Sequence, residues 1–162
     1  MIIRGPVSID VETTGERRVD TADPRRARFL LAAVAPAGIV TERPPRIEPT
    51  AQVAVHNHPY DAVVLGTWDA HWDDTKVLAN IAGEADTTLK GLTQRHLGRP
   101  AMTYEEAERD GLLAPYCLAD AQNTWELLPV LKARLEPSTL RMYEELEKPL
   151  LPLWAKMTIE GS

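Results

Sequence analysis

Apolar and polar positions alternate in the first third of the chain, which predicts β-strands there. Pro6–Val11 (PVSIDV) alternates and is rich in β-branched residues, as strands with one buried face are. Arg28–Ala35 (RFLLAAVA) predicts a second strand and Ala51–Val55 (AQVAV) a shorter third one. The stretch 41–50 is rich in proline and charge, which favours a loop, or an additional strand with proline at its edges.

Beyond residue 55 the apolar spacing changes to that of helices. Pro59 suits the first position of a helix over Tyr60–Gly66. Further helices are predicted from apolar residues three and four apart, from capping residues before them and from glycine after them. They cover Lys76–Ile81, Thr88–Leu97, Tyr104–Arg109 and Pro115–Leu135. Strands followed mostly by helices predict an α/β fold, in which a mixed β-sheet is flanked by α-helices.

The segment 136–162 has an apolar helical stripe of its own. Its members recur at three- and four-residue steps: Leu140, Tyr143, Leu146, Leu150, Leu153 and Met157. We therefore expect a domain over 1–135 and a C-terminal helical segment over 136–162. This segment either folds back onto the domain or, as we favour, presents its apolar face to another domain or another copy of the chain. On this interpretation, cutting the chain after Leu135 leaves the fold of the first part largely intact.

Composition and charge narrow the class of protein. The 162 residues are 44% hydrophobic, which suits one domain with a buried core. The longest apolar stretch, Phe29–Val40, is broken by Pro36 and Gly38 and is too short to span a bilayer, so we expect no membrane partner. The single cysteine, Cys117, excludes an internal disulfide and a Cys-rich zinc site. A reducing cytoplasm is the simplest compartment.

The net charge of −6 argues against a protein that holds duplex nucleic acid through a broad basic face. It does not argue against an enzyme that takes one strand end into a metal site, because bound cations reverse the local charge.

Five residues are candidates for such chemistry. Asp10 and Glu12 are two apart on a predicted strand, so they share a face. Asp61 stands at a helix start, and Tyr116 and Asp120 are four apart on one face of a predicted helix. Taken singly, these are ordinary surface acids, an acid at a helix dipole and a half-buried tyrosine. Together, clustered carboxylates attract hard divalent cations such as Mg²⁺, and a tyrosine beside a metal-bound water can orient it.

The ordered motifs D-x-E, N-x₂-Y-D and Y-x₃-D resemble those of the DEDDY class of exonucleases, which shares the ribonuclease-H-like fold. The runs Asp74-Thr75, Leu89-Lys90-Gly91-Leu92 and Y-C-L-A-D-A-Q-N-T look like the proofreading domain of family A DNA polymerases, the bacterial polymerase I kind. The run E-K-P-L-L-P-L near the C-terminus, with Met157 and Gly161, resembles the link from that domain to the polymerase thumb. The likeness covers nearly the whole chain.

This resemblance implies a 3′→5′ exonuclease that hydrolyses the 3′-terminal phosphodiester of DNA with two divalent metal ions, Mg²⁺ or Mn²⁺, and releases nucleoside 5′-monophosphates. It implies that Asp10 bridges both ions and that Glu12 and Asp120 help to hold the ion on the nucleophile side. It further implies that Asp61 holds the second ion and that Tyr116 hydrogen-bonds the attacking water.

The same resemblance implies that Thr13 and Asn57 contact the substrate, a single-stranded 3′ end of DNA. It also implies a polymerase domain as partner, in cis or in trans. The family often places an apolar wedge after its first motif, but here that stretch is Glu16-Arg17-Arg18-Val19, either a nucleotide contact or a solvated basic loop. Two other functions are open: an RNA-processing exonuclease of the ribonuclease D type, and a catalytically silent structural domain of a DNA polymerase.

Overall fold

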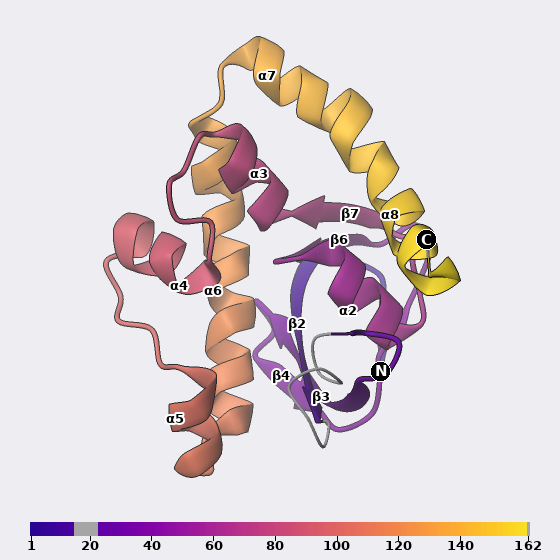
Figure 1. The fold of residues 1–162 in the computed structure, drawn as a ribbon, viewed down its shortest axis with the longest axis vertical. Coiled ribbons are helices and arrows are strands. Elements are labelled where there is room, and N and C mark those ends of the chain that lie inside the picture. Colours follow the sequence, from indigo (N-terminus) through magenta and orange to yellow (C-terminus); the bar gives the residue numbers. More distant parts are fainter. Residues whose placement is uncertain (15–22, 162) are drawn as a thin grey trace.

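The computed structural model describes residues 1–14 and 23–161. A five-stranded mixed sheet in the order β4-β3-β2-β6-β7 lies between helices on both faces (Figure 1). β2 is central, antiparallel to β3 and parallel to β6, while β3 pairs with β4 and β6 with β7. The strands are β2 (Val7–Thr14), β3 (Arg28–Ala35), β4 (Ile39–Thr41), β6 (Gln52–Val55) and β7 (His71–Asp74). A separate parallel pair joins β1 (Ile2–Ile3) and β5 (Arg46–Ile47).

The alternation of β2 decides which of its side chains meet which helices. Ile9 and Val11 belong to the core under α2 (His58–Leu65) and α8 (Lys148–Glu160). The even positions face α6 (Leu113–Ala133), where Ser8 Oγ donates to the carbonyl of Ala121 at 2.5 Å. The candidate acids of β2 therefore lie on the face that α6 covers.

The remaining helices pack around α6, and all of them except α5 contribute to a second core. They are α3 (Thr75–Ile81), α4 (Leu89–Leu92) with its π-helical continuation η1 (Thr93–Leu97), and α5 (Tyr104–Arg109). α7 (Pro137–Met142) and the π-helical turn η2 (Tyr143–Glu147) lead into α8. Leu78, Leu92 and Leu127 are fully buried in this second core. In the part of the chain that the structure describes, no helix is both long and apolar enough to cross a membrane.

The C-terminal segment folds back onto the sheet and α2 (Figure 1). Leu151 and Ala155 are buried in the core beneath α2. The Tyr143 hydroxyl, also buried, donates to Asp73 Oδ1 at 2.8 Å and accepts from the Asp74 backbone N–H at 3.1 Å. The sequence-based picture of a tail that meets mainly another surface overlooked these contacts, because a helical stripe does not reveal its partner.

One side of α8 nevertheless remains exposed and apolar. It presents Leu150, Leu153, Trp154 and Met157. That 136–162 leads towards a polymerase domain stays a prediction.

Strand β7 was missed by the sequence analysis. Its sequence HWDD lacks apolar alternation, yet Trp72, Asp73 and Asp74 are all buried. The Asp73 carboxylate accepts from Tyr143, and the Asp74 carboxylate accepts from the backbone N–H groups of Asn57 and His58. These partners are distant in sequence, so the burial of the two acids was invisible to local patterning. The other predicted elements are present, with ends shifted by a few residues.

Candidate active site

Three elements bring four carboxylates together in one cluster. Asp10 and Glu12 come from β2, Asp61 from the first turn of α2 and Asp120 from α6. Burial, followed by the charges of Glu12, Asp120 and Asp61, raises the pKa of Asp10 well above its ordinary value. The same four acids that the motifs singled out therefore act on one another in space.

The other carboxyl groups are perturbed in the same direction. Burial raises the pKa of Glu12 to about 7 and that of Asp120 to about 6. The pKa of Asp61 is raised well above its ordinary value, first by burial and then by the charges of Asp74 and Glu12. Such a set of acids is unfavourable when ionised together without a cation.

The donors suit a hard divalent cation. Ligand atoms of Asp10, Glu12 and Cys117 all lie within 4.8 Å of one another. Among the described residues, Asp10 Oδ2 is buried and has no hydrogen-bond partner. Burial raises the pKa of the Cys117 thiol, so the carboxylate oxygens are the donors available at neutral pH. Oxygen donors of this kind fit Mg²⁺ or Mn²⁺.

Tyr116 lies next to the acids with its phenol protonated. Burial and then the charge of Asp120 raise the pKa of Tyr116, so its hydroxyl stays protonated beside that carboxylate. The ring meets Tyr104 edge-on, with centroids 6.2 Å apart. A cavity of about 300 Å³ opens beside Tyr116 and Asp120 and includes apolar Met102 and Leu112 in its lining.

Asp74 fixes the segment that carries Asp61. Its carboxylate accepts from the backbone N–H groups of Asn57 at 3.1 Å and His58 at 2.7 Å, just before and at the start of α2. The same carboxylate caps α3 by accepting from Lys76 N–H at 2.8 Å. One buried side chain of β7 thus sets the starts of two helices.

Three comparisons relate this geometry to known proteins. No protein-family model matches the chain. A DNA polymerase I from Rhizobium leguminosarum is 30% identical over 123 residues, which is 65% of this chain but only 12% of the polymerase. The structure of Brucella melitensis NrnC with bound Mg²⁺ matches 99% of this chain and 95% of NrnC, with 19% identity and a TM-score of 0.74. The POL domain of Pol1 from M. smegmatis, in a complex with DNA primer-template and dNTP, matches 94% of this chain and 28% of that chain, with 16% identity and a TM-score of 0.71.

The chain has the ribonuclease-H-like exonuclease fold. The resemblance to the 3′→5′ exonuclease domain of DNA polymerase I is likewise confirmed. The sheet and helices that carry the five candidate residues are therefore those of known nucleases. The assignment of the individual residues to catalysis stays a prediction.

Thr13 and Asn57, the two predicted substrate contacts, differ from each other in burial. The Thr13 hydroxyl is buried and hydrogen-bonded to the Tyr60 hydroxyl at 2.6 Å. Asn57 has the left-handed φ of 86° and an exposed side chain that makes no cap hydrogen bond. Their roles in substrate binding stay predictions, and Glu16-Arg17-Arg18-Val19 lies outside the described residues.

Two residues of the site were not recognised as functional from the sequence. The sequence marks Asp74 only as part of the run Asp74-Thr75, although its carboxylate caps α3 and also holds the start of α2. Lys90 was noted only within a motif, yet its Nζ lies 5.6 Å from the centroid of the Tyr116 ring. A lysine directly after a capped helix start offers no local signal of what it faces.

Proposed function

We propose that the chain is a metal-dependent 3′→5′ exonuclease acting on DNA. The observation that carries this proposal is the convergence of Asp10, Glu12, Asp61 and Asp120, with Tyr116 beside them, in a buried cluster of raised pKa. The similarity to DNA polymerase I supports DNA as the substrate. The Mg²⁺ bound to the similar NrnC supports a divalent cation.

Two divalent cations, Mg²⁺ or Mn²⁺, would be held by the four carboxylates, with Asp10 serving both. When bound, such ions lower the pKa of a water molecule and offset the charge on the phosphate. The raised pKa values of Asp10 and Glu12 fit this role, since cations supply the charge that the cluster lacks.

The remaining work falls to the chain's own residues. The protonated Tyr116 hydroxyl, one helical turn from Asp120 on α6, orients the attacking water. Water adds to the terminal phosphorus, and the bond to the 3′ oxygen of the preceding nucleotide breaks. The products are a nucleoside 5′-monophosphate and a strand one residue shorter with a free 3′ hydroxyl. No protein nucleophile takes part.

The test is digestion of a 5′-labelled single strand, offered as DNA and as RNA, with Mg²⁺, with Mn²⁺ and with chelator. We expect a ladder that shortens from the 3′ end of DNA and disappears with chelator. Faster digestion of RNA favours the ribonuclease D type of function. Absence of digestion of either strand favours the silent structural domain.

Proofreading is part of the same proposal, with a polymerase domain in cis or in trans as partner and a single-stranded 3′ end as substrate. The similarity to DNA polymerase I and to the Pol1 structure supports it. Faster removal of a mismatched than of a matched 3′ nucleotide from a primer-template is the expected result. Equal rates on the two ends contradict a proofreading role.

A further inference from the structure

We propose that Lys90 is a substrate-binding residue whose ammonium group contacts the phosphate of the 3′-terminal nucleotide. This inference rests on the proposed exonuclease function and adds to it a cation supplied by the protein itself.

The backbone that carries Lys90 is held firmly. Thr88 caps α4 by accepting from Gly91 N–H at 3.1 Å. Asp86 in turn accepts from the Thr88 N–H at 2.9 Å and hydroxyl at 2.7 Å. Leu92, two residues after Lys90, is fully buried in the second core. Lys90 therefore projects from a fixed turn, with a flexible side chain on a rigid base.

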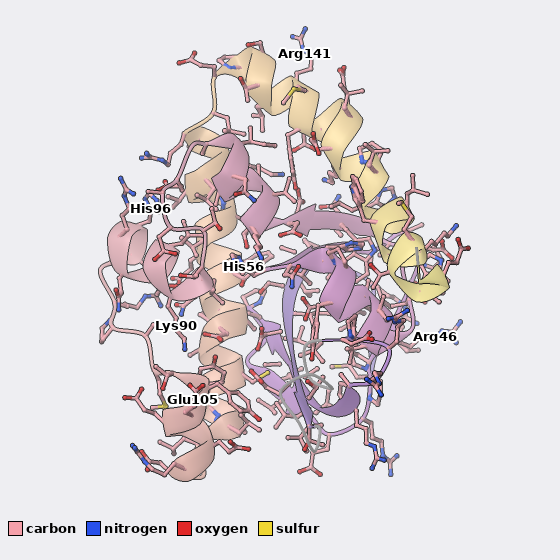
Figure 2. The ribbon with its side chains drawn as sticks, in the orientation of Figure 1. Arg46, His56, Lys90, His96, Glu105 and Arg141 are labelled. Atoms are coloured by element: carbon pink, nitrogen blue, oxygen red, sulfur yellow. The ribbon has the colours of Figure 1, made fainter. Side chains whose placement is uncertain are left out.

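That side chain reaches the mouth of the carboxylate cluster. Lys90 Nζ lies 5.6 Å from the centroid of the Tyr116 ring, within the range of a cation–π contact. Its charge also lowers the pKa of Glu12 and of Asp120. Figure 2 shows Lys90 at α4, next to α6, from which Tyr116 and Asp120 come.

Three arginines that follow Lys90 along the chain form ion pairs. Arg95 pairs with Glu84 at 2.9 Å, Arg99 pairs with Glu126, and Arg109 pairs with Asp110 at 3.0 Å. Within residues 1–14 and 23–161, no carboxylate lies within 4.0 Å of the Lys90 ammonium group. Lys90 is thus a half-buried cation beside the candidate site with capacity for an incoming anion.

A phosphodiester is the anion that the proposed reaction brings to this place. Once divalent cations neutralise the carboxylates, Lys90 adds positive charge close to Tyr116, the group assigned to the attacking water. A lysine binds phosphate as a point charge, and a cation aimed at a reacting phosphate stabilises the charge of its transition state. In the competing role, the Lys90 charge only offsets the negative charge of the carboxylates, which needs no substrate contact.

The experiment compares Lys90→Ala, Lys90→Arg and the control Lys156→Ala, which removes an exposed lysine of α8. Digestion of single-stranded DNA is measured at saturating Mg²⁺, after thermal melting confirms that the variants fold. We expect Lys90→Ala to lower kcat/KM by on the order of 100-fold, Lys90→Arg to recover part of it and Lys156→Ala to change nothing. Loss of one phosphate contact also makes the slope of log affinity against log salt shallower by about 0.7 for a single strand.

Substrate contact and charge compensation by Lys90 are distinguished by how the activity of Lys90→Ala depends on Mg²⁺. If Lys90→Ala only changes the Mg²⁺ requirement and matches the wild type at saturating Mg²⁺, Lys90 compensates carboxylates and the proposal is overturned. If the wild type itself does not digest DNA, the proposed function fails, and Lys90 is then judged by binding of the single strand in Ca²⁺. Weaker binding with the shallower salt slope for Lys90→Ala supports the contact, and equal binding overturns it.

Discussion

At the scale of single residues, Tyr116 and Asp120 lie one turn apart on α6, but we expect their removal to lower the rate of hydrolysis by different amounts. Tyr116→Phe keeps every carboxylate and removes one hydroxyl that orients water. We expect hydrolysis to slow by about one to a few powers of ten and to remain measurable. Asp120→Ala removes a metal ligand and is expected to be far worse. Single-turnover digestion of labelled DNA measures both, and equal losses in two folded variants contradict the role of the tyrosine.

Asp10 and Glu12 give a second contrast, between activity and survival of the fold. The double variant Asp10→Ala, Glu12→Ala is expected to lose 3′ digestion while it stays folded, because two mutually repelling acids are removed. Chain shortening and circular dichroism are measured on the same preparation. Digestion at the wild-type rate by this variant places the active site elsewhere.

The raised pKa of Glu12 predicts that the metal-free protein becomes less stable as the pH rises. The folded protein keeps a proton on Glu12 up to a pKa of about 7, whereas the unfolded chain releases it near 4.5. The free energy of unfolding therefore falls as pH rises through this window. Glu12→Gln removes the penalty, so with chelator at pH 8 it should be more stable than the wild type by about 1–3 kcal/mol.

Below pH 4.5 the advantage of Glu12→Gln should vanish, because Glu12 is then protonated in both states. Mg²⁺ should also reduce it, since binding to the folded wild type stabilises that state. The exposed Glu145→Gln is the matched control and should show no such pH profile. Denaturant unfolding at several pH values measures the difference. An advantage that is the same at pH 4 and pH 8 contradicts the repulsion argument.

At the scale of elements, Asp74 joins β7 to the starts of α2 and α3. Asp74→Ala leaves the N–H groups of Asn57, His58 and Lys76 without their acceptor. We expect a loss of about 2–4 kcal/mol in the free energy of unfolding, because a cap and buried hydrogen bonds are lost together. Thr88→Ala, which removes the exposed cap of α4 and the exposed hydroxyl bond to Asp86, should cost about 1 kcal/mol. Similar costs for the two variants in urea unfolding contradict the view that Asp74 fixes two helices.

The elements that the sequence predicted are those with a regular local pattern. β2 alternates and α6 repeats its apolar residues at helical steps, so the faces of Asp10, Glu12 and Asp120 could be inferred. β7 could not be inferred, since its buried Asp73 and Asp74 depend on Tyr143, about seventy residues away. Lys90 could not be inferred as a residue of the site for the same reason, because only the fold brings it close to Tyr116.

At the scale of the whole molecule, the two faces of the sheet have separate tasks. The face covered by α6 carries Asp10, Glu12 and Asp120. The other face is closed by α2 and α8 over Ile9, Val11 and Leu151. β7 connects the two sides, because Asp73 and Asp74 bind the C-terminal Tyr143 while Asp74 also fixes the start of α2. The C-terminal helices therefore support the element that carries Asp61.

This arrangement predicts that the chain does not tolerate truncation after Leu135, contrary to the expectation from the sequence alone. The cut removes buried Tyr143, Leu151 and Ala155 and leaves Asp73 without its hydroxyl donor. Loss of one large buried side chain costs about 2–5 kcal/mol, so the loss of several should exceed the stability of a typical domain. We expect no cooperative thermal transition.

Truncation after Thr158, which removes exposed Ile159 and Glu160, is the control and should melt like the full chain. Tyr143→Phe separates the hydroxyl from the ring. It should stay folded but lose about 1–3 kcal/mol, because the buried Asp73 carboxylate loses one of its donors and the Asp74 N–H loses its acceptor. A cooperative transition of the 1–135 fragment near that of the full chain would show instead that residues 136–162 are dispensable for the nuclease core.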